Sequence, residues 1–429
     1  MKVRITPSSV SGEILAPPSK SYTHRAVIVA SLAASESILE NPLLSDDTLY
    51  TIDACRSLGA DIELKDDRLK IIGAGGQIRV APEKQRIFVG NSGSTIRMVA
   101  PLAALGQTKV VFDGDSRLRQ RPIGDLLSAL QNLGVHARSL ENNGYPPIEI
   151  QGGRFGGGEV KISGLVSSQH ISSLLMVAPY TEEGISIKIA DGLHSRPYVD
   201  ITIDVMRAFG IETENKDYKE FMVKGSQQYK ARRYRIEGDY SSAAYFLAAG
   251  AIGGKPVTVK NLKADSAQGD RHLLTILSEM GGSVEHREEQ VRISRNKELT
   301  GITADMGDYP DIVPTVAVVA AYAHGKAKIN NIGHLKFKET DRLSDVAAEL
   351  VKMGIRTDVT ENTMTVYGGK PKGAEIEVHA DHRLAMSFAI AALFAEGGSI
   401  ISGAEAVSKS YPQFFTDLKK LGAKIEELS

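Results

Sequence analysis

The sequence contains one cysteine and no tryptophan among its 429 residues. A single cysteine excludes an intramolecular disulfide, and Cys55 falls on an apolar helical stripe, so we expect a buried thiol without a chemical role. Long apolar runs are also missing, because the most apolar stretch, 312–323, is too short and too interrupted to cross a bilayer. The first residues lack the basic-then-apolar pattern of a secretion signal. We therefore expect a cytoplasmic protein with no membrane partner.

The sequence also has no excess of charge of one sign, since 51 basic residues face 52 acidic ones. A net charge of −1 gives no general attraction to nucleic acid or anionic membranes, so any anion binding must come from local clusters. The basic run 230–235 is open to two readings, a solvated linker or a patch for a polyanion. A second basic segment with interleaved aromatics is missing, which argues against a nucleic-acid partner. No His/Cys/Asp cluster has ligand spacing, so we expect no metal and no organic cofactor.

What the sequence does contain is an internal repeat. A large apolar residue, a glycine and then an alternating strand pattern occur together six times. Successive glycines lie 75, 76, 71, 73 and 68 residues apart, which is long enough for a compact unit with helices and several strands. Each glycine suits the left-handed end of the preceding amphipathic helix. The six glycines are Gly59, Gly134, Gly210, Gly281, Gly354 and Gly422.

The ends of the chain indicate how the six units are divided. The last copy stops after one strand, 424–428, whereas the chain begins with two strand-like pieces, 3–5 and 13–15. We infer that the amino terminus completes the sixth unit. The chain must then cross twice between two domains of three units each, near Pro17-Pro18 and near 230–238. The expected fold class is α/β, with one domain formed by 1–19 and 236–429 and the other by 20–235.

Polar and charged motifs recur at the starts of the apolar helices. A helix start exposes unbonded N–H groups and a partial positive charge, so it favours anions and disfavours arginine or lysine. A single motif of this kind is more often a helix cap than a site. A buried cation at a helix start, however, needs an anionic partner. The motifs are 17–25, 90–97, 120–124, 166–170, 309–311, 337–342, 381–383 and 408–412.

Several of these motifs have two interpretations. Asp311 could be the N-cap of the apolar helix 312–323 or a shielded carboxylate suited to proton transfer. The glycine loop 90–93 could be a plain turn or an anion cradle before a helix from Ile96, and it is not a Walker loop. Pro122 is expected at the first helical position, with Arg121 directly before it. His24 is expected to be structural.

Taken together, the motifs resemble those of the 5-enolpyruvylshikimate-3-phosphate synthase family. The resemblance rests on Pro-Ser-Lys-Ser with Arg25, Gly-Asn-Ser-Gly-Ser, Gln-Arg-Pro-Ile-Gly, Ser-Ser-Gln, Lys-Glu-Thr-Asp-Arg, Asp-His-Arg and Lys-Ser-Tyr-Pro, in the family's order across 17–412. It implies two domains, each of three βαβαββ units arranged as an inside-out α/β barrel. One departure is His334, where many relatives carry asparagine.

The resemblance also implies which residues bind two small-molecule substrates. The residues that resemble the shikimate 3-phosphate site are Lys20, Ser21, Arg25, Ser167, Ser168, Gln169, Ser195, Asp311 and Lys338. The residues that resemble the phosphoenolpyruvate site are Lys20, Gly93, Arg121, Gln169, Arg342, Arg383 and Lys409.

The implied reaction transfers the enolpyruvyl group of phosphoenolpyruvate to the 5-hydroxyl of shikimate 3-phosphate. Asp311 would take the hydroxyl proton, and Glu339, with Lys20, would protonate and later deprotonate the methylene carbon.

Two alternative functions compete with this interpretation. A sister enzyme that acts on UDP-N-acetylglucosamine has a reactive loop cysteine and an asparagine after its first lysine, where this chain has Ser21. A non-catalytic anion-binding module would need no carboxylates among its cations. A monomer without cofactor is expected, and glyphosate is expected to compete for the second substrate's site.

Overall fold

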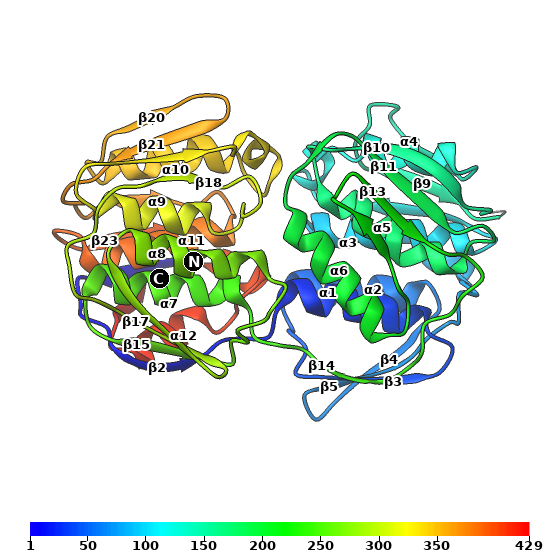
Figure 1. Cartoon of the computed structure of the whole chain (residues 1–429), viewed down its shortest axis with the longest axis horizontal. Coiled ribbons are helices and arrows are strands. Elements are labelled where there is room, and N and C mark those ends of the chain that lie inside the picture. The colour runs from blue at the N-terminus through cyan, green and yellow to red at the C-terminus, as the bar shows by residue number, and fades with distance from the viewer. Residues whose placement is uncertain (154, 429) are drawn as a thin grey trace. The chain divides into compact units, whose positions relative to one another are not determined.

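The computed structural model describes residues 1–153 and 155–428. The chain forms two compact units, which are coloured along the sequence in Figure 1. The terminal unit consists of Met1–Pro17 together with Glu237–Ser429, and the central unit consists of Pro18–Ile236.

The central unit contains alternating helices and short strands. Its helices are α1 (Lys20–Leu32), α2 (Asp46–Ser57), α3 (Gly93–Val99), α4 (Gly124–Asn132), α5 (Ser168–Val177) and α6 (Arg196–Ala208), with the short 3₁₀ segments η1 (Pro82–Lys84), η2 (Ala100–Leu105), η3 (Leu118–Gln120) and η4 (Ala178–Tyr180). Its strands are β3 (Glu36–Glu40), β4 (Asp61–Lys65), β5 (Arg68–Ile72), β6 (Arg86–Phe88), β7 (Lys109–Asp113), β8 (His136–Ser139), β9 (Ile148–Gln151), β10 (Gly158–Gly164), β11 (Ile185–Leu193), β12 (Glu214–Lys216), β13 (Glu220–Val223) and β14 (Arg233–Arg235).

The terminal unit has the same alternation. Its helices are α7 (Tyr240–Gly253), α8 (Leu273–Glu279), α9 (Val313–Ala321), α10 (Arg342–Lys352), α11 (His382–Phe394) and α12 (Phe414–Lys420), with η5 (Gly269–His272), η6 (Gly333–Phe337) and η7 (Ala404–Lys409). Its strands are β1 (Lys2–Thr6), β2 (Gly12–Leu15), β15 (Val257–Lys260), β16 (Gly282–Arg287), β17 (Gln290–Arg295), β18 (Thr303–Asp305), β19 (Lys326–Asn330), β20 (Thr357–Val359), β21 (Thr363–Tyr367), β22 (Glu375–Glu377), β23 (Ser399–Ser402) and β24 (Lys424–Leu428).

The described strands form six four-stranded sheets, three in each unit. All six share one pairing pattern, for which β6-β7-β9-β8 is an example: β6 and β7 are parallel, β7 and β9 antiparallel, and β9 and β8 antiparallel. A parallel first pair requires a crossover helix, and the last two strands form a hairpin. The predicted α/β fold of six repeated βαβαββ units is confirmed.

The strands next to the two crossings pair with strands that are far away in the sequence. β1 lies between β23 and β24 and so completes the sixth sheet, as expected for the amino terminus. β2 does not join it, because it pairs with β15 in the fourth sheet. β14 pairs in the same way with β3 in the first sheet. The basic run 230–235 is therefore not a solvated linker throughout, since its last three residues form a strand and Arg233 lies 3.0 Å from Glu40.

The glycine of each repeat has the predicted backbone conformation. All six have positive φ, between +80° and +109°, directly after a helix. This region strongly disfavours residues with a β-carbon, so the glycine lets the chain leave the helix and enter the next strand. The repeat signal in the sequence is thus the signal that ends one helix per unit.

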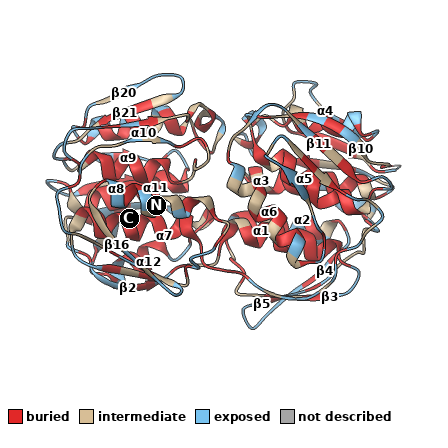
Figure 2. Cartoon of the chain, viewed as in Figure 1, coloured by how far each residue is buried: buried red, intermediate tan, exposed pale blue. Residues whose placement is uncertain are grey.

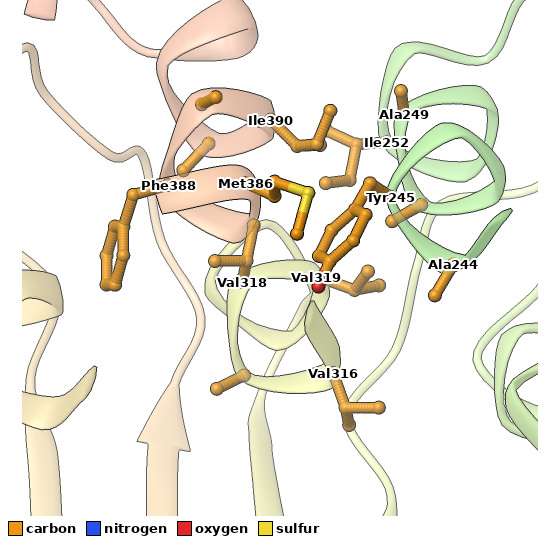
Figure 3. Close-up of a cluster of buried hydrophobic side chains, with 14 of the residues drawn as sticks. Ala244, Tyr245, Ala249, Ile252, Val316, Val318, Val319, Met386, Phe388 and Ile390 are labelled. Atoms are coloured by element: carbon orange, nitrogen blue, oxygen red, sulfur yellow. The ribbon is translucent and has the colours of Figure 1, made fainter. Parts of the chain in front are cut away.

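Helices occupy the interior of each unit, and the strands lie outside them. Every residue of α9 is buried, as are all residues of α7 and α11 except the last of each. Strands such as β1 and β5 instead alternate between exposed and buried residues. Figure 2 shows this distribution, and Figure 3 shows α7, α9 and α11 packing through apolar side chains in the terminal unit. This arrangement is the inside-out barrel that the sequence predicts.

The single cysteine and the apolar helices are the last features of the fold with a prediction from the sequence. Cys55 is buried, and burial raises the pKa of its thiol to about 12, so it is an inert core residue as predicted. Among the described residues, no helix is long and apolar enough to cross a membrane.

Candidate active site

Two buried arginines of the terminal unit meet at one carboxylate. Arg342 is the first residue of α10 and Arg383 the second of α11, and their side chains are 1% and 2% exposed. Arg342 Nη1 donates to Asp311 Oδ1 at 2.9 Å, and Arg383 Nη2 donates to Asp311 Oδ2 at 2.8 Å. The fold therefore brings three separate sequence motifs together.

Asp311 is not a helix cap. The N-cap of α9 is Ile312, whose side chain makes no capping bond, and the helix begins at Val313 with Pro314 in its first turn. The helix itself therefore does not require Asp311. This finding removes the capping interpretation of the motif and leaves a carboxylate held by two guanidiniums.

Arg342 is surrounded by carboxylates. Besides Asp311, Glu339 Oε2 accepts from its Nη2 at 2.6 Å and Asp381 Oδ2 accepts from its Nε at 2.7 Å. Burial disfavours the charged guanidinium, but the attraction of Asp381, Glu339 and Asp311 outweighs that effect, so the pKa of Arg342 lies above its ordinary value. Asp381 also caps α11 by accepting from the backbone N–H of Arg383 at 2.8 Å.

Glu339 connects this cluster to a lysine from the last repeat. Lys409 Nζ lies 3.4 Å from Glu339 Oε1, and both side chains are about nine-tenths buried. Lys338 precedes Glu339 and is half-buried at the end of η6. The terminal unit thus joins Asp311, Glu339, Arg342, Arg383 and Lys409 through direct contacts, with Lys338 adjacent in sequence.

In the central unit, Lys20 begins α1 directly after the N-cap Ser19, as predicted. Lys20 Nζ lies 3.1 Å from Asp47 Oδ2, and the two side chains are 11% and 4% exposed. Asp47 lies in the first turn of α2. The carboxylate compensates the charge of a cation that a helix start would otherwise disfavour.

Arg25 has no carboxylate partner among the described residues, in contrast to Lys20, Arg342 and Arg383. Its Nε donates to Thr202 Oγ1 at 2.6 Å, its Nη2 to the carbonyl of Tyr198 at 2.8 Å and to Ser172 Oγ at 3.5 Å, and its Nη1 to the carbonyl of Ser21 at 3.0 Å. Burial lowers the pKa of Arg25 to about 10. A buried guanidinium with only neutral partners favours an anion beside it.

Ser195 lies close to Arg25 in the fold. It is the N-cap of α6 with a φ of +59°, and its carbonyl accepts from the backbone N–H of Tyr198 at 3.1 Å. Tyr198 in turn accepts from Arg25. The first turn of α6 therefore places Ser195 one turn away from the guanidinium.

The glycine loop packs directly on Arg121. A β-carbon built on Gly93 would lie 2.4 Å from Cζ of Arg121, and Arg121 Nη1 donates to the carbonyl of Asn91 at 3.3 Å. Two predicted helix starts are wrong here. α3 begins at Gly93 rather than Ile96, and α4 begins at Gly124, so Pro122 lies before the helix instead of at its first position. Arg121 is instead positioned by the short η3 segment that ends before it.

Gln169 lies against the same loop. Its Nε2 donates to Ser94 Oγ at 2.9 Å, and its Oε1 accepts from Arg97 Nη1 at 3.2 Å. Ser167 is the N-cap of α5, as expected for this motif, and Ser168 begins the helix and is buried. The central unit thus brings Gly93, Arg121 and Gln169 together through the helices α3 and α5.

Three charged residues of these clusters were not predicted as site residues. Asp47 and Asp381 hold Lys20 and Arg342, and Arg97 bridges Gln169 and the carbonyl of Pro122. Asp381 belongs to the motif 381–383, and Arg97 belongs to the motif 90–97. His24 is buried and its Nδ1 lies 2.7 Å from Thr51 Oγ1, in keeping with a structural role. Among the described residues, no group of three or more His, Cys, Asp or Glu side chains could hold a metal ion.

Comparisons with known proteins identify the family of this chain. A family model described as EPSP synthase (3-phosphoshikimate 1-carboxyvinyltransferase) matches residues 5–427. The chain belongs to the EPSP synthase family. It is 44% identical over 428 residues to the 3-phosphoshikimate 1-carboxyvinyltransferase of Methanococcoides burtonii, covering 99% of both chains. The protein of the same name from Methanocella arvoryzae is 45% identical over 427 residues, covering 99% of this chain and 100% of the other.

A solved member of the EPSP synthase family has the same fold. The EPSP synthase of Acinetobacter baumannii aligns with a TM-score of 0.83 and 26% identity, covering 99% of this chain and 100% of that one. The resemblance inferred from the sequence motifs is therefore confirmed over the whole chain. These matches support the enolpyruvyl transferase reading over the sister-enzyme reading and the non-catalytic reading.

Proposed function

We propose that the charged and polar side chains described above bind the substrates of the EPSP synthase family and carry out its reaction. They lie around Asp311 in the terminal unit and around Arg25 and Arg121 in the central unit. The chain is an enolpyruvyl transferase of aromatic amino acid biosynthesis that joins phosphoenolpyruvate to shikimate 3-phosphate. In this reaction the 5-hydroxyl oxygen adds to the enol carbon while the methylene carbon gains a proton. The tetrahedral intermediate then loses phosphate and a methyl proton. The assignment of single residues to these steps is our proposal.

The main observation that supports the assignment is that Arg342 and Arg383 both form ion pairs with Asp311. Two buried guanidiniums can bind an anion with charge-assisted hydrogen bonds. An incoming anion competes with Asp311 for them, and an oxygen of Asp311 then becomes available for a proton. Anion binding and proton transfer would thus be coupled at one place.

Each substrate carries a carboxylate and a phosphate, so the pair needs many cations. We assign the carboxylate-free guanidinium of Arg25, together with hydroxyl, amide and charged side chains, to shikimate 3-phosphate: Lys20, Ser21, Arg25, Ser167, Ser168, Gln169, Ser195, Asp311 and Lys338. We assign a second set, which shares Lys20 and Gln169 with the first, to phosphoenolpyruvate: Lys20, Gly93, Arg121, Gln169, Arg342, Arg383 and Lys409. The contact of Gly93 with Arg121 supports the second set, and the contact of Arg342 with Asp311 supports neighbouring positions for the two substrates.

Two carboxylates perform the proton transfers in this proposal. Asp311 takes the proton of the 5-hydroxyl as that oxygen attacks the enol carbon, and it gives this proton to the phosphate as that group leaves. Glu339, with Lys20, donates a proton to the methylene carbon and takes one back when phosphate leaves. Glu339 lies between Arg342 and Lys409, which supports a role for these cations beside the departing phosphate. The chain's own side chains supply every proton donor and acceptor that the reaction needs.

The activity is tested by measuring phosphate release. The purified protein with both substrates should release one phosphate for each enolpyruvyl group transferred, followed by phosphorus NMR. Reactions that omit either substrate are the controls and should release none. Absence of phosphate with both substrates would reject the proposed function.

Gly93→Ala is expected to raise the KM for phosphoenolpyruvate and to raise the inhibition constant of glyphosate more strongly. The added methyl group would overlap the Arg121 guanidinium, which must then move away from the loop. Glyphosate is the longer ligand, so it meets the methyl group first. Inhibition is titrated at several phosphoenolpyruvate concentrations, and Gly156→Ala, where φ is outside the left-handed region and no atom lies within 4 Å of the new β-carbon, is the matched control. Equal glyphosate constants in Gly93→Ala and the wild type would place Gly93 outside the site.

The affinity for shikimate 3-phosphate is expected to fall as pH rises above about 10. Burial holds the pKa of Arg25 at about 10 in the empty protein, and only the protonated guanidinium attracts the anion. The affinity due to Arg25 is therefore complete below this pKa and is lost as pH rises through it. Calorimetric titrations from pH 7 to 10.5 should show the wild type approaching the weaker affinity of Arg25→Gln. A constant ratio between the two proteins would contradict the role of Arg25.

We further propose that the protein works in the cytoplasm as a monomer with these two substrates alone. It is proposed to need no metal or organic cofactor and to bind neither nucleic acid nor membranes. The nearly balanced charge supports the absence of polyanion partners. Light scattering during size-exclusion chromatography should give the mass of one chain, and a dimer mass would overturn this part of the proposal.

A further inference from the structure

A tyrosine from the core of the terminal unit reaches one of the two arginines. Tyr245 on α7 is fully buried, and Figure 3 shows its ring among apolar side chains that include Val319 of α9 and Met386 of α11. Phe414 contacts the ring edge-to-face, with the ring centroids 5.7 Å apart. These contacts fix the ring, and a fixed ring fixes the position of its hydroxyl.

The hydroxyl has one hydrogen-bond partner among the described residues, the guanidinium of Arg383. Arg383 Nη1 donates to Tyr245 Oη at 3.1 Å. Burial raises the pKa of Tyr245 to about 12, so the hydroxyl is neutral at physiological pH. A hydroxyl in an apolar core is unfavourable unless it is hydrogen-bonded, and packing alone would be satisfied by phenylalanine. Its presence at this position is therefore explained by Arg383.

The two arginines are held by different kinds of partner. Arg342 contacts three carboxylates, which offset its charge. The hydrogen bonds described for the Arg383 side chain go to one carboxylate, Asp311, and to the neutral Tyr245 hydroxyl. A neutral acceptor orients a guanidinium without competing for an incoming anion as a carboxylate would. When an anion takes over the Nη2 position from Asp311, the bond at Nη1 can remain.

We propose that Tyr245 is a positioning residue that holds the Arg383 guanidinium for the anionic second substrate. This inference rests on the proposed function, in which Arg383 binds phosphoenolpyruvate. Tyr245 does not touch the reacting atoms and acts through the bond to Arg383 Nη1. Its hydroxyl keeps the guanidinium plane directed at the substrate when the substrate anion replaces Asp311 at Arg383 Nη2.

The test is Tyr245→Phe, which keeps the ring and its packing and removes only the hydroxyl. The KM for phosphoenolpyruvate should rise about three- to tenfold, as expected for losing one hydrogen bond to a charged group, and kcat and the KM for shikimate 3-phosphate should change by less than about twofold. Calorimetric titration with phosphoenolpyruvate alone should show the same loss of affinity. Tyr322→Phe is the matched control, because it removes another hydrogen-bonded hydroxyl of this unit, that of the partly buried Tyr322, which donates to the carbonyl of Ala391 at 2.6 Å.

A double variant shows whether Tyr245 acts through Arg383. Lysine at position 383 keeps the charge without the guanidinium, so adding Tyr245→Phe to Arg383→Lys should weaken phosphoenolpyruvate binding no further. An unchanged KM in Tyr245→Phe, an equal rise in Tyr322→Phe, or a further loss in the double variant would each overturn the proposal. A wild type that neither turns over nor binds phosphoenolpyruvate would reject the proposed function itself. A hydroxyl with a merely structural role would lower the unfolding temperature without moving this KM.

Discussion

Asp311→Asn is expected to lower kcat by about a thousandfold, within the range known for general acid–base catalysis. The amide has the shape of the carboxylate but cannot take the proton of the attacking hydroxyl. Asp311 accepts one hydrogen bond from each of Arg342 and Arg383, and the amide oxygen can still accept one of them. Substrate affinity should therefore change far less than turnover.

Steady-state kinetics with both substrates separates these two effects. Asp305→Asn is the matched control, because Asp305 is an exposed acid of the same unit, whose Oδ1 accepts from the backbone N–H of Gly307. The control should keep wild-type turnover. If Asp311→Asn also kept it, Asp311 would only hold the arginines and another group would be the base.

Arg342→Gln is expected to destabilise the terminal unit by about 3–5 kcal/mol, the usual cost of removing one partner of a buried ion pair. Asp381 is fully buried, and Glu339 is about nine-tenths buried. Asp381 would lose the cation that offsets its charge, and Glu339 would keep only its described ion pair with Lys409. The same change removes one of the two guanidiniums proposed to bind phosphoenolpyruvate, so its KM should also rise strongly.

Urea unfolding followed by circular dichroism measures the loss of stability, since the chain has no tryptophan to report it. Arg25→Gln is the informative comparison, because Arg25 is equally buried but its described partners are hydroxyls and carbonyls. Its removal leaves no uncompensated carboxylate and should cost clearly less. A loss in Arg342→Gln no larger than that in Arg25→Gln would show that the carboxylates do not depend on Arg342.

The repeat fold could be predicted because its signals are local. The glycine that ends a helix in each unit appears in the sequence as one phrase, and the structure gives all six a positive φ. The strands with which β2 and β14 pair could not be predicted in this way. Their partners, β15 and β3, lie hundreds of residues away, and a short strand does not encode which distant edge it joins.

The cations of the candidate site could be predicted from the sequence, but the residues that contact them could not. Lysines and arginines at apolar helix starts indicated anion binding, and Lys20, Arg342 and Arg383 do occupy such starts. The partners that hold them were not predictable, because the contact of Asp47 with Lys20 depends on how two helices pack. Tyr245 gave no signal at all, since a tyrosine in an apolar helix has the pattern of a core residue.

The most direct test of the whole account is a crystal structure of the Asp311→Asn protein with both substrates, which slow turnover should preserve. The account predicts that the anionic groups of phosphoenolpyruvate lie on the guanidiniums of Arg342 and Arg383, with Tyr245 still bound to Arg383. It also predicts shikimate 3-phosphate in contact with Arg25 and with its 5-hydroxyl against residue 311. Substrates bound elsewhere, with both arginines still held by the side chain at 311, would contradict it.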